Sequence, residues 1–268
     1  MAGTSPAPVV DGRERVTGTI GGVVYYERTG VGTPIVLCHG LGGNHAIWWR
    51  QIDAFARSHT VVTWDQRGFG NSVGADDQVG IGVAAEDLVA VLDAAELDVA
   101  HVVGQSMGAF VALRAAVDHG DRFLSLTLST TLAGADSSHT RQLNGAIATR
   151  AVRDEHPVLS TAFSRGHPDL GVLYNQISSF GTKPSPQRML DDMAASTYTD
   201  AELASLTPPT LVLAAEADAL CPPDVMARTA QRFTRASYVV LAGASHSAYY
   251  EAPDVWNRAV LEFTDACD

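Results

Sequence analysis

Residues 102–110, VVGQSMGAF, join two kinds of local structure at a single serine. The valines at the start of this stretch are β-branched and favour a strand. The alanines and apolar side chains after Gly108 are typical of a helix. A strand that turns directly into a helix at Ser106 holds the serine hydroxyl clear of the sheet. Such a corner strains the serine backbone and requires small neighbours, which Gly104 and Gly108 supply.

Short apolar runs alternate with longer helical stretches along the rest of the chain. The expected strands are 23–28, 34–38, 60–64, 100–104, 123–129, 209–215 and 237–242, and the expected helices are 44–57, 81–96, 107–119, 224–234 and 254–266. This alternation predicts an α/β fold with a mostly parallel, twisted sheet of about eight strands and helices on both faces. Residues 18–22, GTIGG, predict an antiparallel hairpin at the edge of the sheet.

The alternation breaks once, between residues 132 and 207, where no run is typical of a strand and prolines interrupt a helical pattern. We expect a flexible N-terminal lead-in at 1–14, a core at 15–131 and 208–268, and a helical cap at 132–207 that is inserted after the sixth strand. Aromatic side chains of the cap and of the segment after residue 44 predict a mostly apolar pocket for a modest substrate. These side chains are Phe163, Tyr174, Phe180, Trp48 and Trp49.

Charge and cysteine content limit the expected partners and compartment. The chain has 18 Lys and Arg against 30 Asp and Glu, a net charge of −12 at pH 7 without a basic stripe, which argues against nucleic acid. No apolar run reaches the length of a membrane span, and no secretory signal is recognisable. The three cysteines, Cys38, Cys221 and Cys267, form neither a disulfide framework nor a metal-site spacing. We therefore expect a cytoplasmic protein that acts on a small molecule without a metal or cofactor.

Residues with catalytic chemistry follow the expected strands. In parallel sheets, sites form beyond the carboxyl ends of the strands. His39-Gly40-Leu41 follows the strand at 34–38, Ser106 follows 100–104, Glu216 and Asp218 follow 209–215, and His246 follows 237–242. One serine, one acidic pair and one histidine thus gather at one edge, in an order that predicts a serine nucleophile activated by a histidine base.

Two backbone amides are candidates for an oxyanion hole. The N–H of Met107 stands at the N-terminus of the helix after the serine, and the glycine-rich turn after His39 brings the N–H of Leu41 toward the same point. We interpret His39 itself as a hydrogen-bonded support for this turn. Asp65 and Arg67 are expected to tie down the next loop through charge-assisted contacts or by capping backbone amides.

The pattern as a whole resembles the α/β-hydrolase superfamily. The motifs that carry the resemblance are Gly-Gln-Ser-Met-Gly at 104–108, His-Gly-Leu-Gly-Gly at 39–43, Asp-Gln-Arg-Gly-Phe-Gly-Asn-Ser at 65–72, and the late Asp218 and His246. Within the superfamily the chain is most similar to small esterases, enol-lactonases and meta-cleavage-product (carbon–carbon bond) hydrolases. The resemblance implies Ser106 as nucleophile, His246 as base and Asp218 as the acid that orients it, with the amides of Leu41 and Met107 in the oxyanion hole.

The expected activity is cleavage of a small carboxylic ester or lactone through an acyl-enzyme. One alternative is hydrolysis of a carbon–carbon bond in a diketone-type substrate. Such hydrolases commonly carry Gly-Asn-Ser-Met-Gly-Gly, from which Gln105 and Ala109 depart, and this difference favours esters and lactones. Another alternative is a slow-turnover small-molecule receptor of the same fold. Glu216, two residues before Asp218, is an alternative acid that assists or replaces it.

Overall fold

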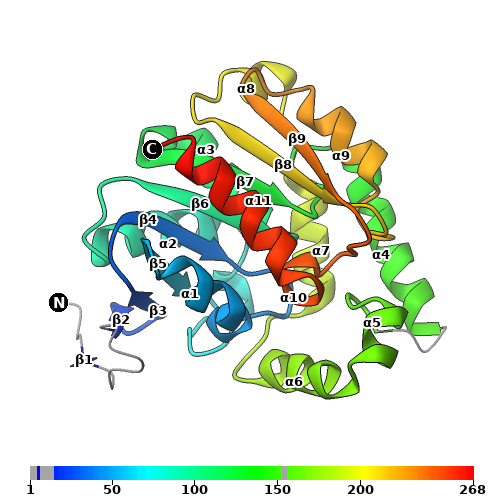
Figure 1. Ribbon diagram of the computed structural model, residues 1–268, viewed down its shortest axis with the longest axis horizontal. Helices are drawn as coiled ribbons and strands as arrows, with labels where there is room; N and C mark the ends of the chain where they lie inside the picture. The colour runs from blue at the N-terminus through cyan, green and yellow to red at the C-terminus, as the bar shows by residue number, and fades with distance from the viewer. Residues whose placement is uncertain (1–4, 7–14, 153–155) are drawn as a thin grey trace.

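The apolar runs form a single sheet in the computed structural model, which describes residues 5–6, 15–152 and 156–268 (Figure 1). The strands are β1 Ser5–Pro6, β2 Arg15–Ile20, β3 Val24–Thr29, β4 Thr33–Cys38, β5 His59–Trp64, β6 Ala100–Gln105, β7 Phe123–Ser129, β8 Thr210–Ala215 and β9 Ala236–Leu241. Their spatial order is β1-β2-β3-β5-β4-β6-β7-β8-β9. All pairs from β5 to β9 are parallel, and β1, β2 and β3 are antiparallel to their neighbours. The predicted mostly parallel sheet is confirmed, with the two-residue β1 as an addition at its edge.

The N-terminal part of the sheet contains the expected hairpin. Gly21 and Gly22, between β2 and β3, have φ angles of 57° and 73°, which a tight hairpin turn requires and glycine adopts without strain. Residues 5–6 were expected to belong to a flexible lead-in but pair with β2 instead. The rest of that lead-in, residues 1–4 and 7–14, lies outside the described residues.

Helices cover both faces of the sheet. Successive side chains of each buried strand point to opposite faces, so both faces are apolar and need to be covered. Val36 and Val62 contact the hydrophobic cluster that includes α2, α3 and α9, whereas Ile35 and Val61 contact the cluster that includes α1, α10 and α11. Figure 1 shows α1, α10 and α11 in front of the sheet and α2 and α3 behind it. These helices are α1 Trp49–Phe55, α2 Ile81–Ala94, α3 Met107–Asp118, α9 Pro223–Ala230, α10 Ala248–Glu251 and α11 Pro253–Asp265, with short 3₁₀ helices at His45–Trp48, Asp76–Gln78 and Gly120–Arg122.

The chain between β7 and β8 is helical in the residues that the structure describes. It contains α4 Ser137–Val152, α5 Thr161–Gly166, α6 Pro168–Ser179, α7 Pro186–Ala195 and α8 Asp200–Ala204. Prolines begin α6 and α7, at a position where the missing N–H has no partner in the helix. Its division from the core as a cap stays a prediction. Within the described ranges, no helix is both long and apolar enough to cross a membrane.

The parallel register brings the ends of the central strands to one edge. Cys38, the last residue of β4, pairs with Gly104 near the end of β6, and Ala215 and Leu241 pair at the ends of β8 and β9. The loops that follow these strands therefore start side by side, at the edge near which α4 and α7 also lie, whereas α8 lies at the opposite end of the sheet (Figure 1).

Candidate active site

Ser106 is the single residue between the end of β6 and the start of α3. Its φ and ψ are 52° and −115°, a left-handed conformation that is strained for a side chain with a Cβ. Two hydrogen bonds hold it there: the Ser106 N–H donates to the Ser129 carbonyl at 3.0 Å, and the Thr131 hydroxyl donates to the Ser106 carbonyl at 2.8 Å. The expected strand–turn–helix corner is therefore present and is anchored to the end of β7.

Gly104 and Gly108 allow the corner to close. A Cβ on Gly104 would lie 2.6 Å from the Ala109 nitrogen, and a Cβ on Gly108 would lie 2.6 Å from the His39 carbonyl oxygen. Both distances are far shorter than van der Waals contact, and both neighbours are backbone atoms that cannot rotate away. The start of α3 thus packs against β6 and against the end of β4 with no room for side chains at these two positions.

His246 lies between Ser106 and Asp218. Its Nε2 is 3.1 Å from the Ser106 hydroxyl oxygen, and its Nδ1 is 3.0 and 3.2 Å from the two Asp218 carboxylate oxygens. The carboxylate also accepts the N–H groups of Leu220 and Cys221 at 2.8 and 2.9 Å, so its position is fixed. Because an ionised carboxylate only accepts, the Nδ1 of His246 carries the proton, and the lone pair of Nε2 faces the serine hydroxyl. This arrangement lets histidine accept the serine proton.

Glu216 does not contact His246. Its carboxylate accepts the Gly243 N–H at 2.7 Å and so bonds to the turn after β9. Its side chain is exposed, whereas Asp218 is buried. Of the two acids left open by the sequence, the structure places Asp218 beside the histidine.

The two candidate oxyanion amides belong to Leu41 and Met107. Leu41 lines the same cavity as Ser106, and Met107 is the first residue of α3. Neither amide donates to another group within the described parts of the chain. The turn that presents Leu41 is closed by the Gly43 N–H, which donates to the Gly40 carbonyl at 3.0 Å. Two free donors beside a nucleophile can stabilise an oxyanion.

His39 supports this turn, as expected. Its Nε2 accepts the Gln66 N–H at 3.1 Å, so the proton is on Nδ1, which lies 2.9 Å from the Gly40 carbonyl oxygen. The Gln66 side chain in turn donates to the His39 carbonyl at 2.6 Å. Burial lowers the pKa of the His39 imidazole, although the Gly40 carbonyl opposes the shift. A neutral ring with this tautomer satisfies both contacts.

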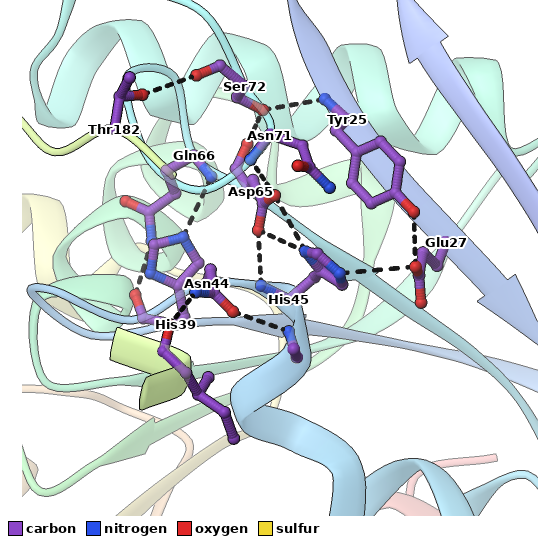
Figure 2. A network of polar contacts seen from close by, with 12 residues as sticks. Tyr25, Glu27, His39, Asn44, His45, Asp65, Gln66, Asn71, Ser72 and Thr182 are labelled. Carbon is purple, nitrogen blue, oxygen red and sulfur yellow. Dashed lines mark hydrogen bonds and ion pairs between the residues drawn. The ribbon is translucent and has the colours of Figure 1, made fainter. Parts of the chain in front are cut away.

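Asp65 is the centre of a buried polar network beside the turn (Figure 2). Its carboxylate accepts the His45 N–H at 2.6 Å and the Asn71 N–H at 2.7 Å, and it lies 2.8 Å from the His45 Nδ1. On the other side of His45, its Nε2 lies 3.5 Å from Glu27, which accepts the Tyr25 hydroxyl at 2.6 Å. The expected capping of backbone amides by Asp65 is present. It ties the segment after His39 to the loop after β5.

Arg67, expected to hold the same loop, does so through a second contact, to α2. Its guanidinium forms two hydrogen bonds to Asp87 of α2, at 2.9 and 2.6 Å. A bidentate pair of this kind fixes both the distance and the orientation of the two groups. The loop after β5 is therefore held at Asp65 and again at Arg67.

A mostly apolar cavity of about 330 Å³ opens over Ser106 and His246. Of the five aromatic residues expected to form it, only Tyr174 is among the described residues that line it. Trp48 is fully buried in the core, Trp49 and Phe180 are 40% and 52% exposed, and Phe163 packs against other aromatic rings. The expectation was correct for the apolar character of the pocket but wrong for four of its residues.

The surroundings of the two cysteines near the site disfavour the thiolate form. Burial raises the pKa of the Cys38 thiol to about 12, and burial followed by the charge of Asp218 raises that of Cys221 well above its usual value. The ligand atoms of Asp218, Cys221 and His246 lie within 4.8 Å of one another. A metal there would require the thiolate form that these surroundings disfavour. It would also have to displace the contact between Asp218 and His246.

Comparison with known proteins shows that the chain belongs to the α/β-hydrolase fold family. The model for that family matches residues 33–165, and one described as TAP-like protein matches 187–265. A relative from Azorhizobium caulinodans named "Putative carbamate hydrolase RutD" is 30% identical over 259 residues, which cover 91% of this chain and 96% of the relative.

Two solved structures have the same fold over nearly their whole length. A thermophilic esterase from Thermogutta terrifontis is similar with a TM-score of 0.80 and 23% identity, covering 100% of this chain and 99% of the esterase. Est816, described as an N-acyl homoserine lactone degrading enzyme, has a TM-score of 0.76 and 25% identity, covering 95% and 98%. The resemblance expected from the motifs is confirmed at the level of the family.

Proposed function

We propose that the chain is a serine hydrolase that cleaves a carboxylic ester or lactone of a small molecule. The observation that carries this proposal is the continuous line of contacts from Asp218 through His246 to the Ser106 hydroxyl. It provides a nucleophile, a base and an orienting acid within hydrogen-bond distance, which is the arrangement that acyl transfer requires.

The reaction proceeds in two halves. His246 takes the Ser106 hydroxyl proton at Nε2 while the serine oxygen attacks the carbonyl carbon. The amides of Leu41 and Met107 donate to the oxyanion, and its collapse expels the alkoxide, which His246 protonates. Water then attacks the acyl-enzyme by the same route and releases the acid and free Ser106. Asp218 stays ionised throughout and stabilises the imidazolium.

The relatives favour acyl substrates of this kind. The similar structures are named as an esterase and as a lactone-degrading enzyme. The relative named as a carbamate hydrolase adds carbamates as a second candidate class, because a carbamate presents the same kind of carbonyl carbon to the serine. A cavity of about 330 Å³ suits short acyl groups.

Turnover of 4-nitrophenyl esters, from acetate to decanoate, tests the proposal. We expect multiple turnover with a preference for short chains, and a loss of kcat of about 10⁴- to 10⁶-fold in Ser106→Ala. Ser237→Ala, which alters an exposed serine of β9, is the matched control and should retain full activity. Retention of more than about a tenth of the activity in Ser106→Ala would exclude the mechanism. An absence of turnover in the wild type would favour carbon–carbon cleavage or the receptor.

A further inference from the structure

Lys183 is the only lysine in the sequence, and it lines the cavity over Ser106. The described residues of that lining include no Asp, Glu or Arg, so Lys183 and His246 are the ionisable nitrogens among them. Burial lowers the pKa of the Lys183 amine, and no carboxylate of the described chain offsets this shift. A partly desolvated ammonium without a counter-ion attracts an anion that enters the cavity.

The backbone on both sides of Lys183 is fixed. The Thr182 hydroxyl donates to the Gly68 carbonyl at 3.1 Å, and the Thr182 N–H donates to the Gly70 carbonyl at 3.4 Å. On the other side, Pro184 is buried, and it would be 3.1 Å from a Cβ placed on Gly68. Lys183 therefore extends from a docked segment of the chain, with its own side chain exposed at the mouth of the cavity.

The docking partner of that segment belongs to the network around Asp65 (Figure 2). Ser72 donates its hydroxyl to the Asp65 carbonyl at 2.6 Å, and the Ser72 carbonyl lies 3.5 Å from the Thr182 hydroxyl. Asn44, next to His45 in the same network, donates its side-chain amide to the Ile177 carbonyl at 2.7 Å. One buried scaffold thus positions the candidate oxyanion turn and the segment that carries Lys183.

The charge of the site selects one class of anion. A single ammonium in a mostly apolar lining matches a single negative charge, whereas a phosphate dianion needs several charged or N–H donors. We propose that Lys183 binds a carboxylate of the substrate, remote from the carbonyl that Ser106 attacks. This inference rests on the proposed function and narrows it to esters and lactones of molecules with a free carboxylate.

Two matched pairs of substrates test the inference on either side of the ester bond. Mono-4-nitrophenyl adipate is compared with its methyl ester, and 4-acetoxybenzoate with methyl 4-acetoxybenzoate. We expect Lys183→Met to lower kcat/KM about tenfold more for the carboxylates than for their neutral partners. Lys183→Arg should restore most of the preference. Arg228→Met, which removes one exposed positive charge of α9, is the control and should change neither class.

The outcomes separate this inference from the proposed function. Cleavage of the neutral esters that is lost in Ser106→Ala supports the proposed function, whatever Lys183 does. Equal effects of Lys183→Met on both members of each substrate pair would overturn the carboxylate site. Binding of adipate, followed as a rise in melting temperature, gives a readout without turnover. We expect a rise in the wild type that Lys183→Met abolishes, and an identical rise in both proteins would also overturn the inference.

Discussion

Gly108→Ala is expected to damage both stability and catalysis, because the new methyl group has no space. Its Cβ would lie 2.6 Å from the Cys38 carbonyl carbon, 2.6 Å from the His39 carbonyl oxygen and closer still to the Cys38 oxygen. Relief requires α3 to move away from the end of β4 by about 1 Å, since an ordinary contact is about 3.5 Å.

The magnitude follows from what must move. Overpacking a core costs about 1–3 kcal/mol when side chains can adjust. Here the obstacle is backbone at the end of a central strand, so we expect at least 3 kcal/mol, a large part of the stability of a typical domain. A displacement of about 1 Å between Ser106 and the Leu41 turn should also lower kcat about 10²-fold in the fraction that stays folded.

Urea unfolding and ester turnover measure the two effects. Gly171→Ala is the matched control, because Gly171 lies inside α6 and nothing is within 4 Å of a Cβ there. This control should raise the free energy of unfolding by about 0.5–1 kcal/mol. The steric argument would be refuted by a Gly108→Ala protein that loses less than about 1 kcal/mol and keeps its activity.

Two further predictions concern carboxylates. Asp218→Asn should lower kcat about 10⁴-fold, whereas Glu216→Gln, which alters only the contact to the turn after β9, should keep kcat; similar losses in both would contradict the assignment of the acid. Burial alone would raise the pKa of Asp65, but His45, His39 and the Asn71 N–H together outweigh it and lower that pKa below its usual value. A lowered folded-state pKa contributes stability above the unfolded value of about 4. The difference in unfolding free energy between wild type and Asp65→Asn should therefore be full at pH 7 and shrink as the pH falls below about 4. A difference that is constant with pH would show that the Asp65 charge is not involved.

The candidate catalytic side chains could be grouped from the sequence because parallel strands end at one edge. Ser106 and His246 each follow a buried strand, so the topology alone brings them near one another. The choice between Glu216 and Asp218 could not be made in this way, since both follow β8. It depends on the path of the turn, in which the Asp218 N–H donates to the Ala215 carbonyl.

The parts of the fold that were not predicted lack a periodic signal. Trp48 and Trp49 are adjacent, yet Trp48 is fully buried and Trp49 is 40% exposed. A short 3₁₀ helix ends at Trp48 and α1 begins at Trp49, and the sequence does not indicate where this change of helix type falls. Lys183 lies in the segment between α6 and α7, where no hydrophobic repeat indicates a direction. Its place at the cavity results from the docking of Thr182 on the loop after β5, a contact between residues more than a hundred positions apart.

The separation of the candidate catalytic groups along the chain also bears on when activity can arise during protein synthesis. Ser106 and His246 are 140 residues apart, and His246 follows β9, which pairs with β8. A chain emerging from the ribosome can form β4, β6 and the serine corner while the histidine is still untranslated. On the proposed mechanism, a nascent chain therefore has no hydrolase activity until β8 and β9 have joined the sheet. A partly made protein then carries a strained serine but no base to activate it.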